Sequence, residues 1–148
     1  MHKTRESFTK KKALTIVRLT AFILVSLILL RSCGQKEDVA TLEGRQAFLL
    51  DLGWEIDAES EEVRKVQLPN VLEGSLADYN EMQLQQGYDL SRHLGETCDQ
   101  YTYRITNHPE KEQTVLATLY VQGHEVIAGD IHSTALNGFL HGLKTEQD

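Results

Sequence analysis

The residues best suited to chemistry are a carboxylate and an imidazole near the end of the chain. In GDIHS, Asp130 and His132 are separated by one residue, so on a β-strand both side chains point to the same face. Together they could bind one divalent metal ion, with His141 from the following tail as a third ligand. The spacing matches no established motif such as HExxH. It favours a solvated strand face, and the three residues stay weak metal candidates.

Packing explains the other reactive or aromatic side chains better than chemistry does. Cys98 with a distant histidine would form a nucleophile–base pair, but a lone cysteine at a strand start is typical of a small, partly buried side chain. Trp54, Tyr101 and Tyr103 could stack on a sugar or a peptide, yet their positions favour the core. The acidic run EIDAESEE lacks the pattern of a calcium loop, so we expect a solvated surface loop. The sequence predicts no catalytic residue and no cofactor.

Two segments carry the signals of helices that would position these side chains. In TLEGRQAFLLDLGW, Thr41 is a plausible N-cap, an apolar stripe follows, and Gly53 is placed to end the helix with Trp54 packing back on it. In a second segment, Ser75 has the spacing of a capping box and Gly87 repeats the glycine–aromatic stop. The run YDLSRHLGE between this helix and the next strand is predicted to be a loop.

Four segments predict strands. EVRKVQL, residues 62–68, ends at Pro69 and indicates an edge strand. From Thr97 onward the apolar period changes to two in residues 97–106, 114–121 and 125–133, with short links that favour an antiparallel meander. The glycines of GDIHSTALNGFLHGL would let the tail turn tightly over the sheet. We therefore expect an α+β fold, with two helices packed on an antiparallel sheet of three to four strands in residues 41–148.

The N-terminal third has a different composition from this domain. Residues 1–12 are basic, residues 13–32 are hydrophobic apart from Arg18 and Arg31, and residues 33–40 form a short polar tether. Residues 34–148 contain 8 Lys/Arg and 21 Asp/Glu, a net charge of −13. A basic end and an acidic domain match positive-inside asymmetry, and they argue against nucleic acid as a partner. We expect a cell-membrane protein with its C-terminal domain outside the cytoplasm.

Three interpretations of the hydrophobic segment remain open. It can be an uncleaved spanning anchor, although residues 13–30 are slightly short for one and contain Arg18. It can be a lipoprotein signal with lipidation at Cys33, although Arg31 departs from that pattern. It can also be a signal peptide cleaved near Cys33, which would release the domain. The first interpretation is favoured.

Four stretches occur in an order that resembles a known bacterial family. They are GRQAFLLDLGWEI, YNEMQLQQGYDLSRHLG, YTYRITNHP and VIAGDIHSTALNGFLHGL. The chain resembles domain of unknown function 4830 over about residues 41–143. The resemblance implies a bacterial protein, usually from Firmicutes, with a hydrophobic N-terminal segment. No activity is assigned to the family, so no functional residue is carried over.

The sequence favours a non-enzymatic binding or interaction module of the bacterial cell envelope. Its expected partners are the membrane, through the N-terminal segment, and an envelope protein or cell-wall component. The alternative is a small extracytoplasmic metal-dependent enzyme that uses Asp130, His132 and His141. The sequence therefore predicts where the protein works in more detail than what it binds.

Overall fold

The computed structural model describes residues 38–110 and 113–144. Contacts divide the chain into Met1–Lys36 and Glu37–Asp148, and everything described below belongs to the second unit. The predicted basic region, hydrophobic segment and Cys33 lie outside the described residues. The elements in chain order are α2 (Leu42–Asp51), β1 (Ile56–Gln67), α3 (Ser75–Gln86), the 3₁₀ turn η1 (Leu90–His93), β2 (Thr97–Ile105), β3 (Val115–Gln122), β4 (Glu125–Ser133) and β5 (Leu140–Gly142).

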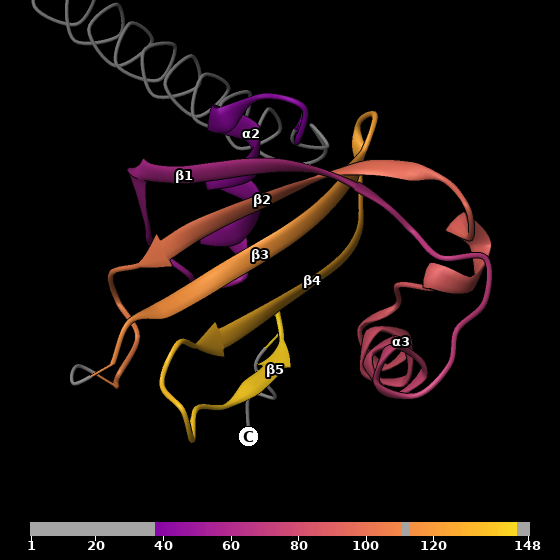
Figure 1. Cartoon of the computed structure of the whole chain (residues 1–148). Coiled ribbons are helices and arrows are strands. Elements are labelled where there is room, and N and C mark those ends of the chain that lie inside the picture. Colours follow the sequence, from indigo (N-terminus) through magenta and orange to yellow (C-terminus); the bar gives the residue numbers. More distant parts are fainter. Residues whose placement is uncertain (1–37, 111–112, 145–148) are drawn as a thin grey trace, which may run out of the picture. The chain divides into compact units, whose positions relative to one another are not determined.

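The strands form one antiparallel sheet in the order β1-β2-β3-β4-β5 (Figure 1). The predicted α+β class, with two helices packed on an antiparallel sheet, is confirmed. The predicted number of three to four strands is wrong, because the tail adds β5 along β4. This strand has three residues, which is too short to display a period-two pattern in the sequence. The segment YDLSRHLGE, predicted to be a loop, contains η1.

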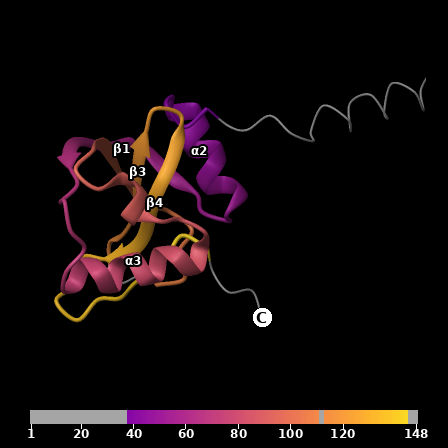
Figure 2. The same cartoon turned by 90° about the vertical axis from the view of Figure 1, so that its right-hand side faces the viewer.

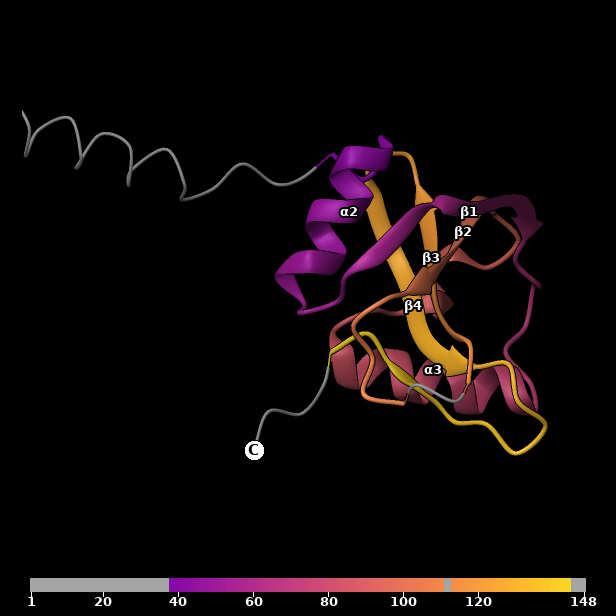
Figure 3. The same cartoon turned by 90° about the vertical axis from the view of Figure 1, so that its left-hand side faces the viewer.

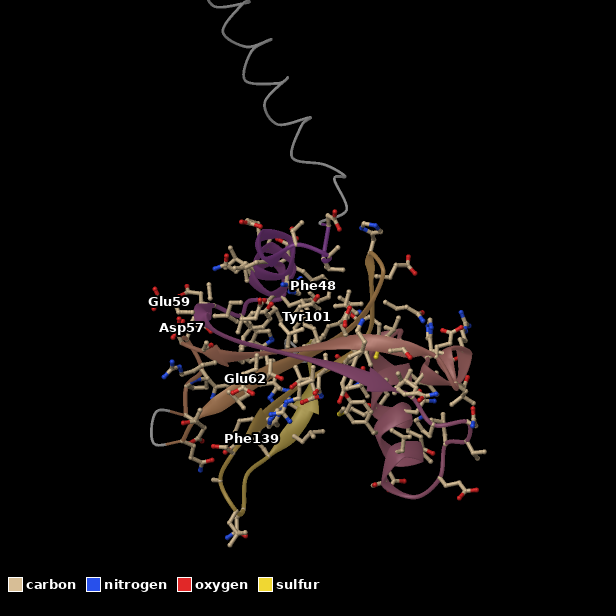
Figure 4. The ribbon with its side chains drawn as sticks, turned by 45° about the horizontal axis from the view of Figure 1, so that its top comes forward. Phe48, Asp57, Glu59, Glu62, Tyr101 and Phe139 are labelled. Carbon is tan, nitrogen blue, oxygen red and sulfur yellow. The ribbon has the colours of Figure 1, made fainter. Side chains whose placement is uncertain are left out.

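Helix α2 begins and ends where its sequence predicts. The Thr41 side chain accepts a hydrogen bond from the Gly44 N–H. At the other end Gly53 adopts a φ of 89°, and the Trp54 N–H donates to the Leu49 carbonyl at 2.9 Å, the pairing that closes a helix after a left-handed glycine. Leu49 and Trp54 are both buried in the larger core between α2 and one face of the sheet. Figure 3 shows α2 along this face, and Figure 4 shows Phe48 and Tyr101 between helix and sheet.

Helix α3 lies apart from α2 (Figure 2). It belongs to the other face of the sheet, where a smaller core includes Leu68, Cys98 and Ala128. Its N-cap is Gly74 without a side-chain bond, so the predicted capping box at Ser75 is wrong. Gly87 ends the helix with a φ of 91°, as predicted.

The buried residues of α3 are amides. Asn80, Gln83 and Gln86 face inward, and Gln83 is fully buried. Its amide nitrogen donates to the Gly129 carbonyl at 2.9 Å, and its amide oxygen accepts from the Gly129 N–H at 3.0 Å. Gly129 lies in β4 immediately before Asp130, the last residue that pairs with β5. The Gln83 amide therefore takes the place of a strand partner where β5 stops.

Strand β1 forms one edge of the sheet, as Pro69 predicts. It also contains most of the acidic run EIDAESEE, so the prediction of a surface loop there is wrong. Asp57 pairs with Arg104 and Glu62 with Thr102, which leaves residues 58–61 opposite Tyr103 alone. This irregularity turns Glu61 toward Arg45, whose guanidinium donates to Glu61 Oε2 at 2.7 Å and lies 3.6 Å from the centre of the Tyr101 ring. The acidic segment is therefore part of the sheet, and the buried Arg45 binds it through Glu61.

Within residues 38–110 and 113–144, no helix is both long and apolar enough to cross a bilayer.

Candidate functional site

The face of the sheet toward α3 carries polar side chains on its central strands. Pairing aligns Thr102 with Thr118 and Thr118 with Asp130, and alternation brings the neighbours two residues away onto the same face. We call this set the polar face: Gln100, Thr102, Thr118, Tyr120, Asp130 and His132. An antiparallel sheet commonly has one apolar face on the core and one polar face. Here the larger core takes the first face, and α3 with the β1–α3 segment flanks the second.

The polar face opens into a groove of about 540 Å³, which we call the α3 groove. Its walls come from the end of β1 with the following segment, from the first turns of α3, and from β5. The apolar members of the lining are Val66, Leu68, Pro69, Leu76, Leu90 and Leu140. The volume lies within the roughly 300–1,000 Å³ typical of ligand pockets. The groove combines apolar walls with a floor of hydroxyl, amide, carboxylate and imidazole groups.

A hydrogen-bonded chain of three residues crosses the groove. The Tyr79 hydroxyl on α3 donates to Asp130 Oδ2 at 2.7 Å. The other carboxylate oxygen, Oδ1, lies 2.8 Å from His132 Nδ1. The Asp130 side chain is 6% exposed and the His132 side chain 29%. The buried carboxylate thus fixes two side chains that both line the groove.

The electrostatics of this chain set its protonation states. The hydrogen bond to Asp130 raises the pKa of His132 against the opposing effect of burial. Burial, and then the Asp130 charge, raise the pKa of Tyr79 far above its ordinary value, so the phenol stays protonated and donates. An ionised carboxylate only accepts hydrogen bonds, so His132 Nδ1 carries the proton directed at Asp130. In neutral His132, Nε2 is then an acceptor.

Two further pairs complete the polar face. The Gln100 side chain donates through Nε2 to the Tyr120 hydroxyl at 2.9 Å. The Thr102 and Thr118 hydroxyls lie 3.5 Å apart. Burial raises the pKa of Tyr120, so this phenol is also protonated. Because the Tyr120 oxygen accepts from Gln100, its own proton is available for a further acceptor.

The structure brings together two of the three predicted metal candidates and separates the third. Asp130 and His132 meet on the polar face, as their spacing predicts. His141 pairs with Ile131, which places it on the opposite face, where its ring stacks on Phe139 at 5.4 Å between centroids. In the described ranges, no group of three or more His, Cys, Asp or Glu side chains is placed to hold a metal ion.

The other candidates belong to the two cores. Cys98 is 3% exposed and burial raises the pKa of its thiol, which opposes thiolate formation. Trp54 is also buried, and its Nε1–H donates to the Leu143 carbonyl at 2.6 Å. Tyr103 is fully buried in the larger core, and Tyr101 packs against that core beneath the Arg45 guanidinium. The prediction that these aromatic rings serve packing is confirmed.

Rings from three separate segments stack beside the larger core. We call Trp54, His108, Phe139 and His141 the ring cluster; its stacked neighbours lie 5.1–5.7 Å apart between centroids. Phe139 and His141 come from the tail, and His141 Nδ1 bonds to the Gly142 carbonyl at 2.7 Å. His141 is therefore part of the attachment of the tail to the domain.

Sequence reasoning missed Tyr79 and the neutral residues of the polar face. The alternation in TVLATLYV indicates that Thr118 and Tyr120 share a face, and the same alternation in β2 does so for Gln100 and Thr102. These four residues are uncharged, and their types alone indicate no particular chemistry. Tyr79 is 51 residues from Asp130, and no local pattern links them.

The fold is that of a small α+β domain with a polar groove on one face of its sheet. A family profile described as domain of unknown function (DUF4830) matches residues 48–131, more than half of the chain. The chain belongs to this family, which confirms the resemblance seen in its sequence. No curated protein and no solved structure matches the chain.

Proposed function

We propose that the protein is a binding module of the bacterial cell envelope, and that its ligand occupies the α3 groove. The observation that carries the proposal is the polar face. Helix α3 and the β1–α3 segment cover part of this side of the sheet, while the central strands present hydroxyl, amide and imidazole groups to the groove. Every buried side-chain nitrogen and oxygen of the described residues already has a hydrogen-bond partner. A ligand would use the remaining donor and acceptor capacity of the groups that line the groove.

The proposal is of binding and not of catalysis. Asp130 and His132 form the carboxylate–imidazole pair of a general base, but within the described residues no serine or cysteine side chain hydrogen-bonds to His132. The alternative is a metal-dependent enzyme with Asp130, His132 and His141 as ligands. It would require His141 to leave the ring cluster and turn to the other face of the sheet.

The location is proposed from the sequence. The basic residues 1–12, the hydrophobic residues 13–32 and the acidic remainder support a domain held outside the cytoplasm by its N-terminal segment, spanning or lipid-attached. The partner in this setting is an envelope protein or a cell-wall component.

Co-sedimentation of the full-length protein, purified in detergent, tests the binding role. The probes are isolated cell-wall material and detergent-extracted envelope proteins coupled to beads. We expect the wild type to sediment with one of them, and the double variant Thr118→Val/Tyr120→Phe to be retained several-fold less. Equal retention of both proteins, or retention of neither by either probe, would contradict the proposal.

A thermal-shift experiment separates the module from the enzyme. Full-length wild type and His132→Ala are heated with Zn²⁺, Mn²⁺ or Ca²⁺. The module predicts no metal-dependent change in Tm for either protein. A stabilisation of the wild type that His132→Ala abolishes would support the metal-dependent alternative instead.

A further inference from the structure

Resting on the binding role above, we propose that the α3 groove takes an uncharged saccharide, held by side chains of the polar face. The proposal follows from three properties of the groove: the absence of free main-chain groups in its floor, the mixed donor and acceptor character of its side chains, and the negative charge beneath them.

The floor offers side chains rather than main chain. Strand β2 is paired on both sides, with β1 and β3, and β3 is paired with β2 and β4. An extended peptide recognised through its backbone adds to a sheet edge, and the groove floor is not an edge. Its ligand therefore has to be recognised by hydroxyl, amide and imidazole groups.

These groups alternate between donating and accepting. The Tyr120 hydroxyl accepts from Gln100 and keeps its proton for a ligand, while the Gln100 carbonyl oxygen accepts. Thr118 can do both, and His132 Nε2 accepts when the ring is neutral and donates when it is protonated. A sugar hydroxyl also donates and accepts at one atom. Neighbouring ring hydroxyls therefore match a floor in which donors and acceptors are interleaved.

Charge excludes acidic ligands. Asp130 is 4% exposed at the floor, and the residues after Cys33 carry a net charge of −13. The positive charge of protonated His132 is paired with the negative charge of Asp130. It is therefore not available to a ligand. The nearby Arg64 is exposed on β1 and already pairs with Glu62 at 3.3 Å. A carboxylate or phosphate in the groove would meet the buried Asp130 charge without a cation of its own.

The walls suit the apolar faces of a sugar ring. Leu76 and Leu140 both line the groove, and the Tyr79 and Tyr120 rings meet edge to face at 6.3 Å between centroids. Aromatic rings with a polar tip combine apolar contact and hydrogen bonding. A sugar ring presents C–H groups on its faces and hydroxyls at its rim, which corresponds to these walls and this floor.

Calorimetry with defined probes tests the proposal on the full-length protein in a detergent that lacks a sugar headgroup. The probes are an N-acetylglucosamine trimer, an acidic trisaccharide of similar size, and trialanine. We expect the neutral trimer to bind, and both Thr118→Val and Tyr120→Phe to weaken its affinity by about tenfold, the loss of one ligand hydrogen bond. Thr114→Val, the same change outside the groove, should leave the affinity unaltered.

Each other outcome overturns the proposal in a distinguishable way. If the acidic trisaccharide binds as tightly as the trimer, the groove does not exclude acidic ligands and the proposal is wrong. If trialanine binds and Tyr120→Phe weakens its binding, the groove takes peptides instead. If both variants bind the trimer with unchanged affinity, the saccharide binds outside the α3 groove. If the trimer does not bind but cell-wall material still retains the wild type, the saccharide proposal is wrong and the proposed binding role is unaffected. Because two variants are measured independently, the experiment still gives a result if one of them does not fold.

Discussion

At the scale of single residues, Asp130 determines the behaviour of His132. We expect Asp130→Asn to lower the pKa of His132 from its raised value toward about 6.5, because the carboxylate that stabilises the imidazolium is gone. NMR titration of the imidazole carbons measures this pKa. Tyr79→Phe retains the carboxylate and is the control in which the pKa stays raised. An unchanged pKa in Asp130→Asn would show that another group causes the shift.

The same raised pKa makes a pH-dependent contribution to stability. Because the pKa of His132 is higher in the folded state, protonation stabilises the fold fully below about pH 6.5, and this part is lost as the pH rises through the folded-state pKa. We expect the difference in unfolding free energy between wild type and His132→Asn to shrink by about 1 kcal/mol from pH 6 to pH 9. Urea unfolding at the two pH values measures it. A difference that grows with pH would contradict the assignment.

Arg45 provides a second prediction at this scale. Its side chain is 4% exposed and pairs with Glu61. Burial would raise the pKa of Glu61, but hydrogen bonds from Tyr103 and Arg45 hold it below its ordinary value. We expect Arg45→Met to cost about 2–3 kcal/mol of unfolding free energy, because a partly buried carboxylate loses its cation. Arg64→Met removes a pair that is 72% and 66% exposed and should change stability by less than about 1 kcal/mol. Similar urea midpoints for the two variants would contradict the larger contribution of Arg45 to stability.

The candidate site was partly predictable from its residues. The spacing of Asp130 and His132 suffices to place them together, because two residues on a strand share a face in any register. His141 depended on how the tail pairs with β4, and one step of register moves a side chain to the other face. Tyr79 reaches Asp130 only through the packing of α3, which no local pattern specifies.

At the scale of elements, α3 shows why its packing was hard to predict. Sequence rules locate a buried helix face by its apolar residues, whereas here Asn80, Gln83 and Gln86 point inward. Their burial is possible because each amide has a backbone partner: Gln83 at Gly129, Asn80 at the Leu90 N–H and Gln86 at the Lys144 N–H. The cap of α2 was predictable because Thr41 and Gly53 act on their own chain neighbours. The Gly129 partner of Gln83 lies 46 residues away in the sequence.

A substitution of Gln83 tests how α3 is attached to the sheet. We expect Gln83→Leu to lower the unfolding free energy by about 2–4 kcal/mol, because the Gly129 N–H and carbonyl both lose their partner in a buried place. Amide hydrogen exchange at Gly129 should accelerate in the variant. Gln85→Leu changes an exposed amide on the same helix and is the matched control. Unchanged protection of Gly129 would mean that the Gln83 amide does not hold this edge.

At the scale of the whole molecule, we propose that the N-terminal segment holds the domain at the membrane. We expect the membrane-extracted protein to have its full-length mass both as wild type and as Cys33→Ala, because a spanning anchor needs neither cleavage nor lipid. Intact mass spectrometry measures both. A lipid-bearing mass that begins at Cys33 in the wild type alone would replace the spanning anchor by lipidation. A shortened, unmodified chain in the medium would indicate release.

The ring cluster has a consequence for when the domain can fold. Leu143 is fully buried and accepts from Trp54, Phe139 stacks on His108, and the His141 ring lies tilted against Trp54. These tail residues follow all four longer strands, so they are the last of the core to leave the ribosome. Until they arrive, Trp54 lacks its partner and the larger core stays open. For the export proposed above, such late closure would leave the larger core unformed until the tail has been synthesised.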